Sequence, residues 1–142
     1  SYLITMQCDY GHTLYEVGDA KAGTYETLAK ALAHFAAKIH NGNVLHKDFT
    51  PGNVLWKQDD EGFHFSLVDI NRMHFGQVSA KQGLYNLRKF WGPKEFIRIM
   101  VTEYALLRNL DVGKSVDYVM RERAKFWTKY GRKQEIPFKL EL

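Results

Sequence analysis

The chain has 142 residues, of which 45% are hydrophobic and 14% aromatic, so it can bury one sizeable core and is expected to form a single domain or lobe. Its single cysteine, Cys8, excludes an internal disulfide framework and a zinc site of several thiolates, and suits a reducing cytoplasm. The net charge of +4 is modest, and no apolar run approaches the roughly 20 residues that span a bilayer, so a soluble or peripheral protein is expected.

The first elements in chain order are a strand and a long helix. The chain begins without an initiator Met and directly in an apolar stretch at 2–8, which predicts that it is a fragment opening on a buried strand. Residues 24–41 then carry apolar side chains at three- and four-residue spacing, which indicates an amphipathic helix. Thr24 is expected to cap the start of this helix, and Gly42 stands where it should stop.

The most informative stretch is His-Lys-Asp-Phe-Thr-Pro-Gly-Asn at residues 46–53. Strand-like runs flank it, and a predicted turn at 59–62 leads into an alternating strand that delivers Asp69 at its end. A phosphotransferase needs one carboxylate to orient an attacking hydroxyl, an amide oxygen a few residues on to hold a metal ion, and a second carboxylate on the next hairpin. Asp48, Asn53 and Asp69 have this chemistry in this order.

The remainder of the chain is predicted to be helical. One helix is expected over 79–91, a second is expected to start at Pro93, and a third is expected to be capped by Ser115 and closed by Pro137. Basic residues gather late in the third helix: Arg121, Arg123, Lys125, Lys129, Arg132 and Lys133. They fit either an anionic partner, such as phosphorylated lipid or the anionic inner leaflet, or a solvated helix end whose cations complement the helix dipole.

Several other site classes find no support in the sequence. The six histidines make no H-E-x-x-H pattern, so a dedicated zinc site is not expected. The glycines form neither G-x-G-x-x-G nor a P-loop, and no recognised nucleic-acid motif is present. His46 stands apart from the other five histidines, because two residues before Asp48 it would order the loop through hydrogen bonds.

The wording His-Lys-Asp-Phe-Thr-Pro-Gly-Asn-Val-Leu resembles the lipopolysaccharide kinase family, which phosphorylates Kdo or heptose in the inner core, within the protein-kinase-like superfamily. The resemblance runs from about residue 2 to about residue 76. It implies an α+β, mostly helical fold, namely the carboxy-terminal lobe of a kinase with small β-hairpins carrying the catalytic and metal-binding loops. The implied division of 1–142 is: strand and hinge at 1–11, central helix at 24–41, catalytic loop and metal-binding hairpin at 44–76, and helical remainder at 79–135.

By the same resemblance, Asp48 would be the catalytic base with His46 bracing its loop, and Asn53 and Asp69 would hold Mg²⁺. Met6, Gln7 and Cys8, where the first strand runs into the hinge, would contact the adenine of ATP; an ordinary edge strand is the alternative. Asn71 and Arg72, with His74, are weaker candidates for the acceptor site; an ordinary surface loop is the alternative. The amino-terminal lobe, with its Gly-rich loop and phosphate-pairing Lys, is not found in this sequence, so the isolated chain is expected to be inactive.

The sequence also departs from typical protein kinases. Lys47 stands where they have Arg, Thr50 where they have a phosphate-contacting Lys, and Asp-Ile-Asn at 69–71 replaces Asp-Phe-Gly. These departures favour a sugar or small-molecule kinase. The expected function is therefore ATP-dependent phosphoryl transfer to an inner-core sugar in the cytoplasm, at or near the inner membrane. An aminoglycoside-like small-molecule kinase and a non-catalytic pseudokinase or scaffold remain as alternatives.

Overall fold

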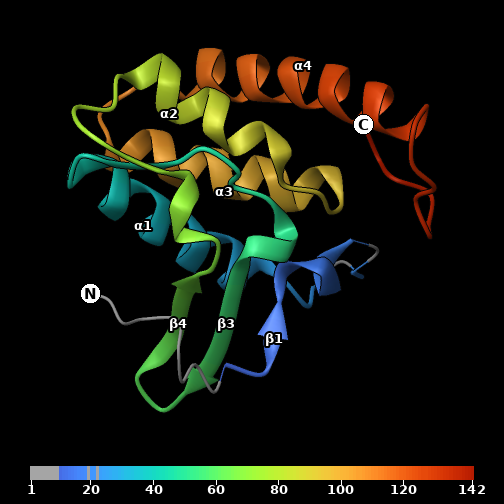
Figure 1. The fold of residues 1–142 in the computed structure, drawn as a ribbon, viewed down its shortest axis with the longest axis horizontal. Helices are drawn as coiled ribbons and strands as arrows, with labels where there is room; N and C mark the ends of the chain where they lie inside the picture. Colours follow the sequence, from blue (N-terminus) through green and yellow to red (C-terminus); the bar gives the residue numbers. More distant parts are fainter. Residues whose placement is uncertain (1–9, 19, 22) are drawn as a thin grey trace.

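A computed structural model describes residues 10–18, 20–21 and 23–142. Within these residues the chain forms helices that lie above a three-stranded antiparallel sheet in Figure 1, and a second, two-stranded antiparallel sheet, which confirms the predicted α+β class. The strands are β1 (His12–Thr13), β2 (Val44–His46), β3 (Val54–Asp59), β4 (Gly62–Leu67) and β5 (Met73–Phe75). The α-helices are α1 (Glu26–Asn41), α2 (Ala80–Asn86), α3 (Lys94–Leu107) and α4 (Val112–Gly131).

The predicted central helix is confirmed as α1, and only its start differs. Its buried stripe includes Leu28, Leu32 and Ala36, which are at most 6% exposed, and this stripe packs against α3. Thr24 does not cap the helix, because its hydroxyl donates backward to the carbonyl of Lys21. The carboxylate of Glu26 instead accepts from backbone amides just before the helix, where a negative charge also complements the helix dipole.

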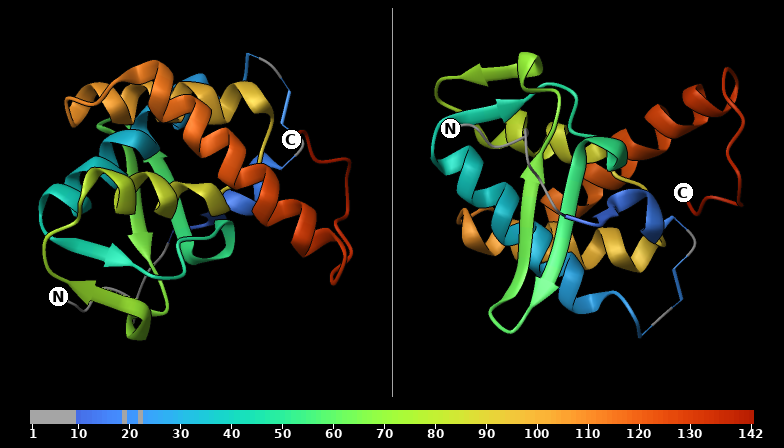
Figure 2. Two further views of the ribbon diagram at one scale, coloured as in Figure 1. Left: turned by 90° about the horizontal axis from the view of Figure 1, so that it is seen from above. Right: turned by 60° about the horizontal axis from the view of Figure 1, so that its bottom comes forward.

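The two sheets place the loops of the central motif. Strands β1, β3 and β4 form one sheet, and β2 and β5 form the other (Figure 2). The predicted turn at 59–62 is confirmed, since Asp59 pairs with Gly62 across a two-residue connection. Gly62 has a φ of +113°, which glycine adopts without strain. Strand β2 enters the loop that follows His46, and β5 follows the turn after Asp69, so the smaller sheet brackets both loops.

The later helices differ from the prediction at their boundaries. Ser79 caps α2 through a capping box with Gln82, but α2 ends at Asn86 and a single 3₁₀ turn, η4 (Leu87–Lys89), continues the chain. The predicted cap at Ser115 is wrong, because Asp111 accepts from the amide of Lys114 and α4 starts four residues earlier than expected. Ser115 lies inside the helix and is buried.

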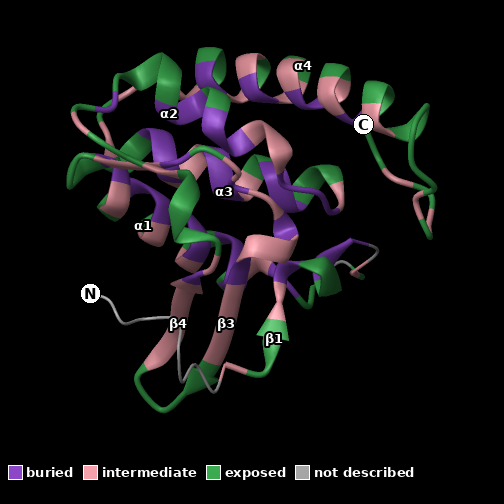
Figure 3. Ribbon diagram, viewed as in Figure 1, coloured by how far each residue is buried: buried purple, intermediate pink, exposed green. Residues whose placement is uncertain are grey.

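The hydrophobic core lies between the helices and reaches the central motif. Figure 3 shows buried residues on the facing sides of the helices, whereas the β3–β4 hairpin is mostly half-buried or exposed. Phe49 is fully buried, with its ring centroid 4.7 Å from that of Phe90. Burying such a ring stabilises the fold by about 2 kcal/mol, so this side chain anchors the loop around Asp48 to the core.

Among the described residues, none of the helices combines the length and the hydropathy that a membrane-spanning helix requires.

Candidate active site

The pairing of β2 with β5 brings the two loops of the motif together. His46 lies opposite Met73 in this ladder, and the amide of Lys47 donates to the carbonyl of Arg72 over 2.7 Å. The loop that carries Asp48 and the turn that carries Asp69 therefore run side by side. They are separated in sequence by the whole β3–β4 hairpin.

His46 joins these loops directly. Its side chain is fully buried; Nε2 lies 2.8 Å from the carbonyl oxygen of Val68, and Nδ1 lies 3.0 Å from the backbone nitrogen of Asp48. A carbonyl can only accept and an amide N–H can only donate, so the ring is neutral with its proton on Nε2. Both ring nitrogens are committed to the backbone. His46 therefore fixes the loops and is not placed to act as a base, which agrees with the expectation from the sequence.

Asn53 connects the same two loops from the other side. Its Nδ2 donates to the carbonyl of Asp48 over 2.8 Å and lies 3.2 Å from Oδ2 of that residue. The backbone carbonyl of Asn53 accepts from the backbone amide of Val68 over 3.0 Å. Among the described residues no hydrogen bond engages Oδ1 of Asn53. The amide group thus orients Asp48 through its nitrogen and leaves its oxygen available.

Asp69 follows β4 in the left-handed conformation, with φ 61° and ψ 55°. This conformation is uncommon for a residue other than glycine and is concentrated at functional sites, although Asp tolerates it better than most. The residue is exposed, and within the described part of the chain its carboxylate makes neither a hydrogen bond nor an ion pair. The carboxylate is therefore free to bind a ligand.

The donor chemistry of Asn53 and Asp69 fits Mg²⁺. Both side chains offer hard oxygen atoms, the kind of ligand that Mg²⁺ prefers. The backbone carbonyl of Asn53 accepts from Val68, the residue just before Asp69, so Asn53 and Asp69 lie at the same end of the β3–β4 ladder. Mg²⁺ usually takes only one or two protein carboxylate or amide ligands and completes its shell with water and substrate phosphates. No group of three or more His, Cys, Asp or Glu side chains among the described residues could hold a metal ion by itself.

Lys89 is a residue of this site that the sequence did not indicate. It lies on η4, and its Nζ is 3.5 Å from Oδ1 of Asp48. The Lys89 side chain is 18% exposed and that of Asp48 is 37% exposed, so the pair sits at the edge of the site. The two residues are 41 positions apart, and no local pattern links them.

A buried polar network supports the loop at residues 46–53. The side-chain Nδ2 of Asn86 donates to the carbonyl of His46 over 2.9 Å, and its Oδ1 lies 2.9 Å from Nε2 of His40. Nδ1 of His40 lies 2.6 Å from the hydroxyl of Tyr104, which in turn accepts from Arg108 over 2.9 Å. Burial lowers the pKa of His40 to about 4, so the imidazole is neutral, as this donor and acceptor pattern requires.

The other predicted site residues are less well placed. Met6, Gln7 and Cys8, and the whole strand predicted at 2–8, lie outside the described residues. Asn71 and Arg72 lie on a short exposed turn, η3 (Ile70–Arg72), directly after Asp69. Their position beside the site is compatible with acceptor contact.

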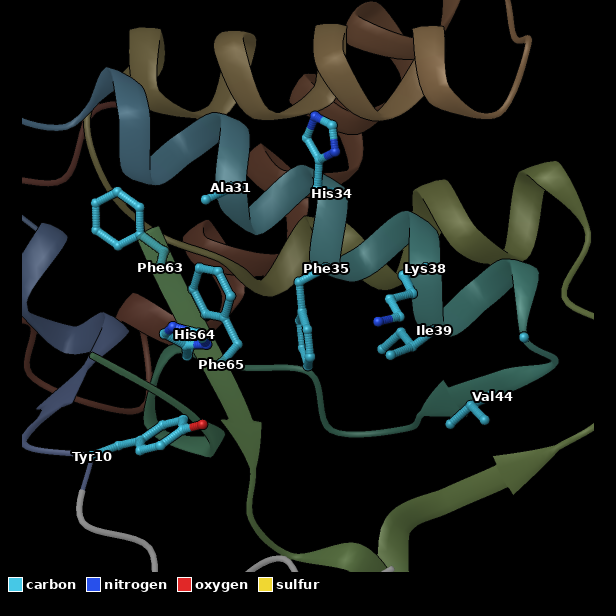
Figure 4. A pocket seen from close by; sticks show the side chains of 11 residues that line it. Tyr10, Ala31, His34, Phe35, Lys38, Ile39, Val44, Phe63, His64 and Phe65 are labelled. Atoms are coloured by element: carbon cyan, nitrogen blue, oxygen red, sulfur yellow. The ribbon is translucent and has the colours of Figure 1, made fainter. Parts of the chain in front are cut away.

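A pocket of about 840 Å³ lies apart from the site of the motif. It lies between α1 and β4, and Figure 4 shows its aromatic lining from Tyr10, Phe35, Phe63 and Phe65. None of the predicted site residues contributes to its wall. Its polar side chains, such as His34 and Lys38, do not form a cluster typical of an active site, and we assign no function to this pocket.

The basic cluster expected on the last helix loses its central member. Arg123 is fully buried and donates to the carbonyls of Phe90, Gly92 and Glu141. Burial lowers its pKa to about 10, so it remains charged at neutral pH. It holds the C-terminal segment onto the turn before α3 and cannot reach an anionic partner. The sequence pattern misplaced this residue, because the helix turns its side chain toward the core.

The lipopolysaccharide kinase (Kdo/WaaP) family model matches residues 12–103, more than half of the chain and the whole region that carries the loops described above. The chain belongs to this family. It is also similar to the calcium/calmodulin-dependent protein kinase type I of Schizosaccharomyces pombe (strain 972 / ATCC 24843), with 28% identity over 120 residues. That similarity covers 82% of this chain but 33% of the relative, so the chain spans about a third of the relative's length.

Membership of the Kdo/WaaP family confirms the resemblance inferred from the motif at 46–53, and the similarity to a protein kinase supports the wider superfamily. The family match and this similarity together support a kinase.

Proposed function

We propose that this chain is the catalytic-loop lobe of an ATP-dependent kinase that phosphorylates a sugar hydroxyl, Kdo or heptose, of the lipopolysaccharide inner core. The observation that carries the proposal is the junction of the two loops, in which His46 and Asn53 both bond to Val68 and to the backbone of Asp48. These bonds join the loop of Asp48 to the strand end that leads into Asp69, which supports a shared site in a chain of the Kdo/WaaP family.

Asp48 orients the acceptor hydroxyl and receives its proton as the oxygen attacks the γ-phosphorus. Its backbone is held by His46 and Asn53, so its carboxylate is aimed before the substrate arrives, and such positioning lowers the entropic part of the barrier. Asn53 and Asp69 supply the oxygen ligands for Mg²⁺. When bound, the metal neutralises charge on the ATP phosphates.

The remaining parts of the proposal concern regions around this site. Met6, Gln7 and Cys8, which lie outside the described residues, contact the adenine, and an amino-terminal lobe covers the phosphates. Asn71 and Arg72 line the acceptor side, since they directly follow Asp69 and are exposed. The protein acts in the cytoplasm, and exposed Lys129 and Arg132 near the end of α4 can contact anionic lipid at the inner membrane.

The test is a transfer assay with the full-length protein. Labelled phosphate from Mg·ATP is followed onto purified inner-core lipopolysaccharide, beside a generic protein acceptor and an aminoglycoside. Asp48→Asn is the catalytic variant, and Asp60→Asn, in the exposed β3–β4 turn, is the matched control. We expect transfer to the sugar that falls by about 10²- to 10⁴-fold in Asp48→Asn and stays unchanged in Asp60→Asn.

The acceptors separate the alternatives. Label on the protein acceptor, as the name of the yeast relative would suggest, or on the aminoglycoside, would replace the substrate class while keeping the chemistry. A folded protein that binds Mg·ATP and transfers to none of the three acceptors would refute the lipopolysaccharide-kinase proposal, in favour of another small-molecule acceptor or a scaffold.

A further inference from the structure

Lys89 is a cation beside the proposed catalytic base, and the motif does not explain its presence. Its Nζ lies 3.5 Å from Oδ1 of Asp48, at the long limit of a hydrogen bond. An ammonium group has three donors, and among the described residues Asp48 is the single carboxylate within 4 Å of this one. Lys89 therefore has unused donors next to the carboxylate that would face the reacting hydroxyl.

The backbone around Lys89 is fixed to the catalytic loop. Three residues earlier, Asn86 donates to the carbonyl of His46 over 2.9 Å. One residue later, Phe90 is 1% exposed and packs edge-on against Phe49 of the loop. A buried hydrogen bond on one side and a buried aromatic contact on the other leave η4 little freedom. The position of the cation relative to Asp48 is thus set by the core.

The side chain of Lys89 is also confined. Its Nζ lies 5.6 Å from the ring centroid of Phe126 on α4, a distance that allows a favourable cation–π contact. With 18% of the side chain exposed, the ammonium is partly removed from water, which strengthens its interaction with a charged ligand. Its surroundings thus make it more than a freely moving surface lysine.

Within the loop at 46–53, all of which the structure describes, no cationic side chain forms an ion pair with Asp48. Thr50, two residues after Asp48, is half-buried and uncharged. Lys47, one residue before, is exposed. Phosphoryl transfer spreads negative charge over the oxygens of the transferring group, so a cation beside the base stabilises the transition state.

We propose that Lys89 binds the phosphoryl group in transfer and so supplies, from η4, the positive charge that Thr50 cannot provide. In the step, the acceptor oxygen forms a bond to the γ-phosphorus and its proton passes to Asp48. The bond between that phosphorus and the β–γ bridging oxygen breaks, and ADP leaves with the electron pair. Lys89 keeps its proton throughout. The inference rests on the proposed kinase function but not on the identity of the acceptor.

The neighbouring Arg88 provides a matched control. It has the same charge and lies on the same turn, but its guanidinium stands 3.6 Å from the ring centroid of Tyr85 and donates to the Tyr85 carbonyl over 2.9 Å. The structure therefore commits its charge away from Asp48. A general effect of removing one cation from η4 should appear in Arg88→Gln as well as in Lys89→Gln.

The experiment compares Lys89→Gln, Lys89→Arg and Arg88→Gln in the full-length protein. We expect kcat to fall about 100-fold in Lys89→Gln, with KM for ATP changed less than about threefold, and to recover to within about tenfold of wild type in Lys89→Arg. Arg88→Gln should keep wild-type kcat. Equal losses in Lys89→Gln and Arg88→Gln, or wild-type kcat in Lys89→Gln, would overturn the assignment.

A second measurement needs no acceptor. Binding of Mg·ADP with and without aluminium fluoride, which mimics the transferring phosphoryl group, is followed by calorimetry. Lys89→Gln should lose at least about tenfold of the affinity gained from aluminium fluoride and keep the affinity for ADP alone. An unchanged gain would show that Lys89 only orients Asp48. If the acceptor proves not to be lipopolysaccharide, the kcat comparison with the actual acceptor still decides the role of Lys89.

Discussion

Lowering the pH should weaken the fold through one buried imidazole. His40 is 1% exposed, and its pKa is lowered from 6.5 to about 4, chiefly by burial, with the charge of Arg108 acting in the same direction. Between these two values the unfolded chain binds a proton that the folded chain excludes. The stability contributed by the neutral ring is therefore complete above pH 6.5 and is lost as the pH falls toward 4. The full difference corresponds to about 3 kcal/mol, of which about 2 kcal/mol is lost between pH 7 and pH 5.

The assay is urea unfolding of wild type and His40→Gln at pH 7, 6 and 5. Glutamine can still accept from Tyr104 and donate to Asn86, but it does not titrate. Contributions from all other groups are common to both proteins, so the difference between the two pH profiles isolates His40. We expect the wild type to lose about 2 kcal/mol more than the variant over this range. Parallel profiles would refute the reasoning, because they would mean that the folded ring takes up a proton as readily as the unfolded one.

Three further changes probe the core and the proposed metal ligand Asp69. Arg123→Met should lower the free energy of unfolding by about 3 kcal/mol, because the carbonyls of Gly92 and Glu141 lose the guanidinium donor, while that of Phe90 keeps the Trp127 indole as a donor. The exposed Arg121→Met should change it by less than about 0.5 kcal/mol. Denaturant unfolding checks both variants, and similar losses would contradict the buried role. Gly83→Ala should destabilise the fold by about 1–2 kcal/mol, since a methyl group there would overlap the Tyr104 hydroxyl of the buried network. Gly113→Ala has ordinary van der Waals room and should stabilise the fold by up to about 1 kcal/mol. Thermal unfolding of both variants gives the signs, and a gain in both would be inconsistent with tight packing at Gly83. Asp69→Asn should lower kcat of the full-length protein at least about 100-fold in the transfer assay, and activity within about threefold of wild type would remove it from the metal site.

The central motif was predictable because its geometry is local. The spacing of His46, Asp48 and Asn53 fits one loop between two short strands, and the alternation up to Asp69 predicts the hairpin that returns to it. Hydrogen bonds within residues 46–69 then join the two loops. The left-handed backbone of Asp69 is part of the same turn, although the sequence does not reveal it.

The errors at the helix starts have a common cause. Thr24, Asp111 and Ser115 are all residues that can cap a helix, and the sequence cannot rank one against another when packing decides where the helix begins. The inward direction of Arg123 was missed for a similar reason. A basic residue among other basic residues looks exposed until the opposite wall, the carbonyls of the turn before α3, is known.

The sequence by itself predicted the chemistry, since a carboxylate, an amide and a second carboxylate in this order along residues 46–69 are typical of a kinase site, and the family match supports a kinase. Only the tertiary structure decided which distant groups complete that site. Lys89 approaches Asp48 because Phe90 packs on Phe49, and Asn86 carries the buried network to the loop. Such contacts join residues about 40 positions apart through core packing, which leaves no periodicity or spacing for a sequence to display.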